Sequence, residues 1–192
     1  MKRDTRQEII EAAARLIHMQ GYTATGIKEI VEAAKVPKGS FYFYFPSKEA
    51  LGLALVEHYC EIVRSGWEPV LADASTPPLE RLRRLFLARI QSREEAGYAL
   101  GCPIGGLAQE MSALSGPLRE RLRQALDGLT AMVRSLLEEA AQSGLLPQGM
   151  DPATAAAFIV DAWEGALLRM KADAGPEALD RFMSVVFDRL LV

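Results

Sequence analysis

The sequence predicts an all-α protein of about nine helices, divided into a small amino-terminal part (residues 1–47) and a larger carboxy-terminal part (residues 48–192). Apolar residues recur at spacings of three and four, as on one face of a helix, and Gly and Pro fall between these periodic segments. No alternating run rich in Val, Ile and Thr suggests a strand. With 192 residues, 49% apolar and 24% charged, the chain resembles ordinary globular proteins and is long enough for a sizeable core.

Three helices are expected in the first 47 residues. They span about residues 5–20, 26–34 and 38–45. Gly21 is expected to end the first helix, and Thr25 to cap the second. Residues 35–37 form the turn before the third, which Pro46 closes. Two short helices joined by a three-residue turn, behind a longer supporting helix, are the pattern of a helix-turn-helix domain.

Six further helices are expected to begin near residues 48, 79, 103, 116, 152 and 176. Ser47 is expected to cap the fourth helix, and Asp151, followed by a proline at the first helical position, to cap the eighth. The clearest break is residues 73–78, and Gly144 ends the seventh helix. The fourth helix carries two apolar stripes and is therefore expected to be packed on two sides (Leu51, Leu55, Tyr59 and Ile62; Val56, Cys60, Val63 and Trp67).

The net charge of −3 conceals an uneven distribution. Residues 1–48 hold eight Lys and Arg, Lys2 and Arg3 among them, against five acids, a net charge of +3. The remainder holds fourteen bases against twenty acids, a net charge of −6. A basic first quarter is consistent with a nucleic-acid partner, whereas the charge of the whole chain suggests none.

The third expected helix carries five consecutive aromatic residues, 41–45. If this segment is helical, Phe41 and Phe45 face inward, and Tyr42, Phe43 and Tyr44 lie on the outer faces. Exposed rings beside lysines suit DNA, because a tyrosine hydroxyl can donate to phosphate and its ring can contact a deoxyribose or a thymine methyl. The alternative is a buried strand or a core aromatic cluster.

Three residues around these rings add to the DNA interpretation. Lys38 can donate to guanine acceptors, and Gly39 allows the backbone to approach closely. Lys48 lies in the first turn of the fourth helix, where free N–H groups favour a phosphate.

The run from Thr25 to Leu51, TGIKEIVEAAKVPKGSFYFYFPSKEAL, closely resembles the DNA-binding signature of the tetracycline-repressor (TetR) family of bacterial transcriptional regulators. The resemblance implies a homodimer that binds a roughly palindromic operator and is released when a small molecule enters the carboxy-terminal domain, with no cofactor. The usual DNA contacts of the family fall here on Thr25, Lys28, Lys38, Gly39, Ser40, Tyr42, Tyr44 and Lys48. Tyr44 stands where the family often has His, which affects the expected base preference and not the mode of binding.

The last two expected helices, about 152–173 and 176–191, are the candidates for a dimer interface. The first is rich in Ala and Gly, which permit close helix approach, and the second has a broad Leu, Phe, Met and Val stripe. Both could equally complete the core of their own chain. The family resemblance favours a four-helix interface between two copies.

Large apolar side chains of the fourth to eighth helices are the candidate effector contacts, although each could be plain core. They are Tyr59, Trp67, Phe86, Ile104, Met111, Met132, Phe158 and Trp163. Their size and character suggest an apolar or aromatic small molecule.

Cys102 provides an alternative mode of sensing. Because Pro103 is expected to be the first helical residue, Cys102 occupies the cap, where a helix N-terminus lowers the pKa of a thiol. The Gly101-Cys102-Pro103 segment also looks like one found in a branch of the family that responds to electrophiles or oxidants. Against this, a free cysteine is usually a small buried hydrophobe, and no Lys or Arg lies nearby in the sequence. Cys60 lies inside a packed helix and is a weaker candidate.

Other classes of function have little support. No apolar run could span a bilayer, no secretory signal opens the chain, and two cysteines form no disulfide framework, so the expected location is the cytoplasm. Neither His18 nor His58 lies in a metal-ligand or catalytic pattern, and acid pairs such as residues 94–95 look like solvated helix faces. We therefore expect no enzyme. An all-helical carrier of hydrophobic small molecules is the remaining alternative.

Overall fold

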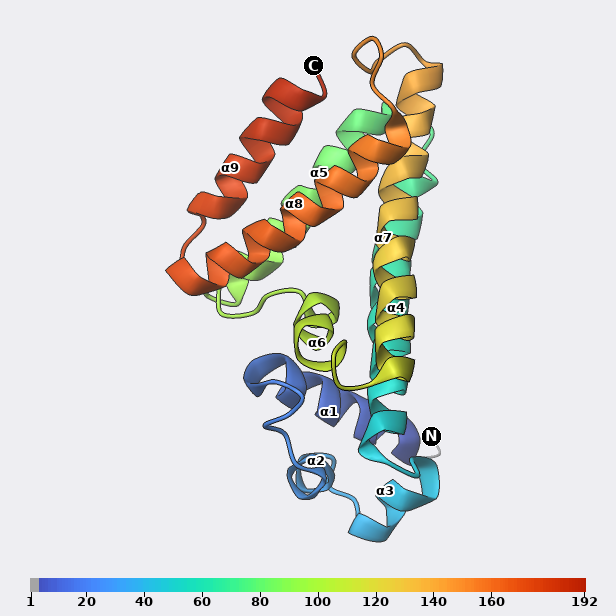
Figure 1. The fold of residues 1–192 in the computed structure, drawn as a ribbon, viewed down its shortest axis with the longest axis vertical. Coiled ribbons are helices and arrows are strands. Elements are labelled where there is room, and N and C mark those ends of the chain that lie inside the picture. The colour runs from blue at the N-terminus through green and yellow to red at the C-terminus, as the bar shows by residue number, and fades with distance from the viewer. Residues whose placement is uncertain (1–3) are drawn as a thin grey trace. The chain divides into compact units, whose positions relative to one another are not determined.

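The computed structural model describes residues 4–192, so the two basic residues at positions 2 and 3 and the first residues of the predicted 1–47 domain lie outside the described part. The described chain is all-α, as predicted, with nine α-helices, one short π-helix and no strand (Figure 1). The α-helices are α1 (Thr5–Gln20), α2 (Ile27–Ala33), α3 (Lys38–Tyr44), α4 (Lys48–Leu71), α5 (Pro78–Glu95), α6 (Pro103–Met111), α7 (Gly116–Gln142), α8 (Pro152–Asp173) and α9 (Glu177–Val185). None of these helices is both long enough and apolar enough to cross a membrane.

The chain packs into two compact units. Unit 1 comprises the described residues up to Ile62 together with Pro103–Ala125, and unit 2 comprises Val63–Cys102 and Leu126–Val192. Helices α4 and α7 therefore each begin in unit 1 and end in unit 2. The predicted boundary at residue 47 separates two functions and stays a prediction, whereas these units are defined by packing.

In unit 1, helices α1, α2 and α3 pack against one another (Figure 1). Asp4 caps α1, because its carboxylate accepts the Gln7 N–H at 3.1 Å. The predicted cap of α2 is wrong. Gly26, in an extended conformation, occupies the N-cap position without any side-chain bond, and Thr25 turns its hydroxyl back to the Gly21 carbonyl at 2.7 Å.

The first turns of α4 complete unit 1. The Ser47 hydroxyl accepts the Ala50 N–H at 3.0 Å, which confirms the predicted cap. Leu51, Leu55 and Tyr59 of the predicted inward stripe are buried, but Ile62 is 54% exposed. The stripe therefore ends one turn earlier than its spacing suggested.

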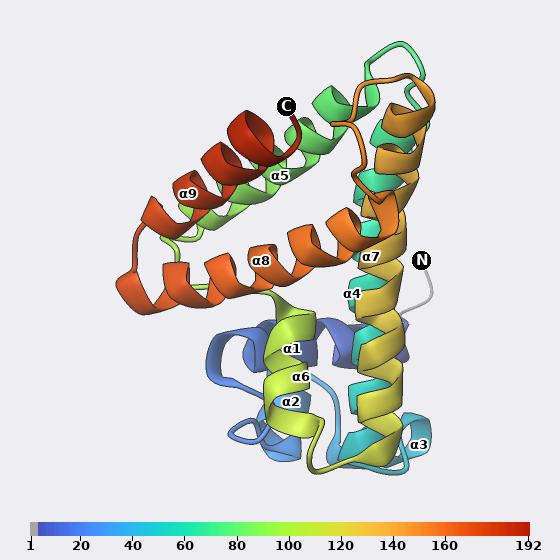
Figure 2. The ribbon, with the colours of Figure 1, turned by 45° about the horizontal axis from the view of Figure 1, so that its top comes forward.

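In unit 2, helix α9 lies against α8 and α5 (Figure 2). The Asp151 carboxylate caps α8 by accepting the Thr154 N–H at 2.9 Å, as predicted. The predicted single helix over 176–191 changes character near its end, where α9 is followed by the π-helix η1 (Val186–Leu190). The Leu191 N–H bonds to the Val186 carbonyl five residues earlier at 3.0 Å, and this wider turn leaves both side chains buried.

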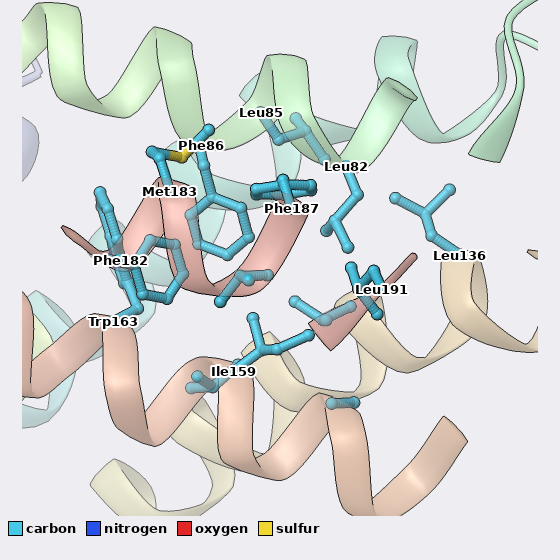
Figure 3. Packing of buried hydrophobic residues seen from close by; sticks show 14 of the residues in the cluster. Leu82, Leu85, Phe86, Leu136, Ile159, Trp163, Phe182, Met183, Phe187 and Leu191 are labelled. Carbon is cyan, nitrogen blue, oxygen red and sulfur yellow. The ribbon is translucent and has the colours of Figure 1, made fainter. Parts of the chain in front are cut away.

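Aromatic rings form the centre of the unit 2 core. Phe86 of α5 lies 5.0 Å from Trp163 of α8 and 4.9 Å from Phe182 of α9, measured between ring centroids (Figure 3). Trp67 and Phe187 flank the same ring at 6.3 and 6.1 Å. These tilted and edge-on contacts join α4, α5, α8, α9 and η1 through one side chain.

Candidate functional site

Helix α3 divides its five aromatic residues between two environments. Phe41 and Phe45 are buried, with 0% and 2% exposure and ring centroids 5.7 Å apart. Tyr42, Phe43 and Tyr44 are exposed by 52%, 81% and 36%. The helical interpretation of this segment is confirmed, and the buried-strand alternative is wrong.

A short turn sets the direction of α3 relative to α2. Lys35 adopts a left-handed conformation with φ of 56°, unusual for a residue other than glycine. The Lys35 N–H bonds to the Glu32 carbonyl at 3.1 Å, and the Val36 N–H to the Val31 carbonyl at 3.0 Å. These bonds close the end of α2, so that the chain can begin α3 within three residues.

Four of the predicted DNA contacts lie on α2 and at the start of α3. Lys28, Lys38 and Gly39 are exposed, and Ser40 is half-buried. The Lys28 side chain is 84% exposed and only 3.9 Å from the Glu32 carboxylate, an exposed i,i+4 pair that contributes little to stability. The ammonium groups of Lys28 and Lys38 can therefore turn towards a phosphate.

Lys48 has a different environment from Lys28 and Lys38. Its ammonium donates to the Tyr22 carbonyl at 2.5 Å and lies 4.4 Å from the centroid of the Tyr22 ring. Burial lowers the pKa of Lys48, and the Glu110 charge opposes that effect. In this structure Lys48 holds the segment between α1 and α2 against the start of α4.

Thr25, like Lys48, differs from the exposed predicted contacts on α2 and α3. Its side chain is fully buried, with a hydroxyl that donates to Gly21 and accepts from Gln20 Nε2 at 3.2 Å. Of the eight predicted contacts, Thr25 and Lys48 are thus engaged inside unit 1. The other six lie on α2 and α3 at or near the surface.

Glu110 of α6 is a positioning residue that the sequence did not reveal. Its carboxylate accepts the Tyr22 N–H at 3.0 Å and the Thr23 N–H at 2.8 Å. Burial would raise the pKa of Glu110, but the backbone bonds from Thr23 and Tyr22 lower it overall. Gly21 makes this contact possible, because its φ is +96° and a Cβ there would lie 2.9 Å from Glu110 Oε1.

The predicted effector contacts are divided between the two units. Tyr59, Ile104 and Met111 belong to unit 1 and are buried. The Tyr59 hydroxyl donates to the Ala14 carbonyl at 2.9 Å, so this side chain has a structural role in joining α4 to α1.

The other predicted contacts lie in unit 2, where the structure brings three of them together. Trp67, Phe86 and Trp163 share the aromatic core, and Met132 packs against its edge. Phe182 and Phe187 belong to the same cluster, which agrees with the alternative that the last helix completes the core of its own chain. Helical periodicity identifies an apolar face without indicating which element covers it.

Phe158 lies outside that core. Its side chain is 52% exposed and lines a groove of about 360 Å³ between α8 and α9. This groove is open to solvent and does not enclose a ligand. The groove is mostly apolar and also carries two arginines; its lining is Phe158, Ala162, Gly165, Ala166, Arg169, Ala178, Arg181, Phe182, Val185 and Val186.

Cys102 has charged neighbours in space that are absent from its sequence surroundings. It is half-buried against the unit 2 core, hydrogen-bonds Glu164 of α8, and interacts electrostatically with Arg89 and Arg93 of α5. Burial lowers the pKa of both arginines and raises that of Glu164. A helix that lies ahead of Cys102 in the chain therefore supplies the positive charge that the local sequence lacks.

Two family profiles match the chain. Residues 9–55 match "Bacterial regulatory proteins, tetR family", and residues 78–186 match "Tetracyclin repressor-like, C-terminal domain". The second match alone spans more than half of the 192 residues.

Relatives match over nearly the full length. The chain is 34% identical to the HTH-type transcriptional repressor DhaR of Mycobacterium sp. strain GP1, over 97% of this chain and 92% of that protein. It is 38% identical to the transcriptional regulator AcuR of Cereibacter sphaeroides, over 92% and 80%. The HTH-type transcriptional repressor NemR of Escherichia coli K12 is 27% identical, over 95% and 92%.

Solved structures agree with this. A TetR regulatory protein from Rhodobacter sphaeroides, 36% identical, aligns with a TM-score of 0.90 over 97% of this chain and 98% of that one. The reduced form of E. coli NemR, 27% identical, aligns with a TM-score of 0.87 over 97% of both chains.

Proposed function

Because this chain belongs to the tetR family of bacterial regulatory proteins and is a ligand-responsive DNA-binding repressor, we propose that the outer face of α3 enters the major groove of a palindromic operator. A small effector bound by the carboxy-terminal domain then releases the protein from DNA. The operator lies in the DNA of a bacterial cell, so the protein acts in the cytoplasm.

The observation that carries the proposal is the row of three adjacent exposed rings on α3. Adjacent exposed aromatic rings are a feature of surfaces that contact a partner. Tyr42 and Tyr44 offer hydroxyl donors to phosphates, and Phe43 offers an apolar surface to a deoxyribose or a thymine methyl. Phe41 and Phe45 fix the orientation of all three from below.

The basic residues supply the electrostatic part of operator binding. Lys28 and Lys38 lie on α2 and α3 with exposed ammonium groups, beside Gly39 and Ser40 at the start of α3. Lys48 and Thr25 can contact the operator only if their present hydrogen bonds, to the Tyr22 and Gly21 carbonyls, are broken first. In the free protein these two side chains support the helices that carry the other six.

We assign the dimer contact to α8 and α9, over about residues 152–173 and 176–191. Small residues and exposed apolar side chains line the groove between them, with Phe158 52% and Val185 52% exposed. A second copy related by a two-fold axis would cover these groups and bring two α3 helices to half-sites about one DNA turn apart.

We assign effector recognition to unit 2. Its aromatic core suits an apolar or aromatic molecule, and displacement of one ring by such a ligand would shift the helices that meet at Phe86. The alternative, a thiol-based repressor in which Cys102 reacts with an electrophile or oxidant, is supported by Arg89 and Arg93, since nearby cations stabilise a thiolate.

Salt dependence of operator binding tests the proposal. Fluorescence anisotropy should detect binding to DNA upstream of the gene, with an affinity that falls steeply as salt increases. Lys38→Ala should weaken binding and reduce the slope of log affinity against log salt by about one. The matched control is Arg84→Ala, an exposed cation on α5 outside the assigned dimer contact, which should leave both quantities unchanged. Binding of equal strength to unrelated DNA would contradict the repressor assignment, as would a slope that Lys38→Ala does not alter.

The thiol alternative requires a separate measurement. If Cys102 is the sensor, Cys102→Ser should abolish release of DNA by a thiol-reactive electrophile, whereas Cys60→Ser should retain it. Full release from DNA by the electrophile in Cys102→Ser would eliminate this alternative and leave the apolar effector.

A further inference from the structure

A charged cluster in unit 2 contains more positive charge than the fold neutralises. Arg89 and Arg93 lie four residues apart on α5, so their side chains share one face of the helix. Arg93 is only 8% exposed. Arg89 is half-buried, with its guanidinium 5.9 Å from the centroid of the Trp67 ring. Buried charges of one sign are costly unless an opposite charge accompanies them.

Glu164 is the carboxylate that acts on this pair, and it compensates them incompletely. Over residues 4–192, none of the ion pairs shorter than 4.0 Å involves Arg89 or Arg93. Arg93 Nε and Glu164 Oε1 are both buried without a hydrogen-bond partner. A buried donor and a buried acceptor thus remain unsatisfied within one cluster, which native interiors generally avoid.

The same helix shows how this fold otherwise accommodates a buried arginine. Arg81 is 2% exposed, and its guanidinium forms an ion pair with Glu139 and donates to the Leu71 carbonyl at 2.7 Å. Its Nε has no partner, but both terminal nitrogens do. Arg93 has no comparable ion pair, although it lies on the same helix.

We propose that Arg89 and Arg93 bind the carboxylate of a small organic acid, and that this acid is the effector of the repressor. The second half of this statement rests on the function proposed above. A carboxylate carries one negative charge and two acceptor oxygens in a plane, which suits guanidinium donors. The organic part of the ligand would pack against Trp67, whose largely buried ring lies beside the Arg89 guanidinium.

Access and the remaining polar group also fit such a ligand. Arg89, Cys102 and Glu164 are each half-buried, so solvent reaches the cluster. Burial raises the pKa of Glu164, although its interactions with Cys102, Arg93 and Arg89 oppose that effect, so its carboxyl takes up a proton more readily than burial-free surroundings would allow. The competing source of negative charge is a thiolate at Cys102, and the experiment below distinguishes the two.

Pairs of acids and their amides test the charge requirement directly. Calorimetric titration and thermal melting of the full chain would compare propionate, hexanoate and benzoate with propionamide, hexanamide and benzamide. We expect at least one acid to bind about tenfold more tightly than its amide and to raise Tm. Arg93→Met should abolish that response. The matched control is Arg84→Met, an exposed arginine on the same helix, which should retain it.

The ligand-free variant provides a second measurement. If Arg93 is held uncompensated for a ligand, Arg93→Met should have a Tm equal to or above that of the parent protein, because an unpaired buried charge has been removed. A lower Tm together with unchanged acid binding would mean that Arg93 is structural and would overturn the site.

Three results would overturn the carboxylate site. They are no response to any of the acids, equal binding of acid and amide, and a thiolate absorbance at 240 nm from Cys102 at pH 7 in a Cys60→Ser background. An acid that binds without releasing operator DNA would confirm the site and remove its role as effector. Release by a neutral apolar compound alone, in a protein that binds none of the acids, would overturn the site and leave the proposed function standing.

Discussion

Aromatic residues occur in two contrasting settings in this protein. In unit 2, Phe86 and its neighbours contact one another within 4.9 to 6.3 Å and are almost entirely removed from water. On α3, three adjacent rings remain exposed although two others beside them are buried. The rings of unit 2 stabilise the fold through their contacts with one another. The three exposed rings of α3 contribute little to the free energy of folding, as expected of a surface that contacts a partner.

The strongest test of this contrast replaces one ring from each set. Phe86→Ala should lower the free energy of unfolding by about 3–5 kcal/mol, because it leaves a cavity where five helical segments meet. Phe43→Ala should change it by about 0.5 kcal/mol or less, since that ring is 81% exposed. Urea unfolding followed by circular dichroism gives both values. A large loss of stability in Phe43→Ala would show that the α3 rings are structural.

A smaller effect is expected when the exposed rings are tested for DNA binding. Tyr42→Ala and Tyr44→Ala should each weaken operator affinity by about tenfold, roughly 1.4 kcal/mol, with unfolding unchanged. Titration of labelled operator at fixed salt provides the measurement, with Tyr98→Ala in unit 2 as the matched control. Affinity that is unaffected in both α3 variants would exclude this face as the operator contact.

The smallest expected effect concerns the carboxylate that supports the DNA-binding helices. Because the folded-state pKa of Glu110 lies below its usual value of 4.5, its bonds stabilise unit 1 fully above that pH and lose this contribution as the pH falls through the lowered pKa. The difference in unfolding free energy between the parent and Glu110→Gln should therefore be largest at neutral pH and shrink on acidification. A difference independent of pH between 7 and 3 would contradict the assigned role.

Features determined by local sequence were predicted well. The limits of α1, the caps at Ser47 and Asp151, and the inward and outward sides of α3 all depend on residues within one or two helical turns of each other. Local signals also mislead where neighbouring structure competes. Thr is a residue type common at helix N-caps, but the hydroxyl of Thr25 donates to the Gly21 carbonyl instead.

Features that depend on distant residues could not be predicted. Glu110 lies 88 positions after Tyr22, and no periodicity connects them. Likewise, the sequence around Cys102 contains no cation, whereas α5 supplies two in the folded chain. The change from α9 to η1 is similar, because the helical spacing of the last apolar residues does not distinguish an α-helix from a π-helix.

The contact between Gly21 and Glu110 has a consequence for genetics. Every single-base missense change at Gly21 adds a side chain to a residue with φ of +96° and places its Cβ within 2.9 Å of the Glu110 carboxylate. A random screen for alleles that express their target genes constitutively should therefore recover Gly21 repeatedly. Such alleles would contact neither operator nor effector, and shortening the side chain at position 110 should not rescue them, because the bonds to Tyr22 and Thr23 would be lost and the strained φ would remain.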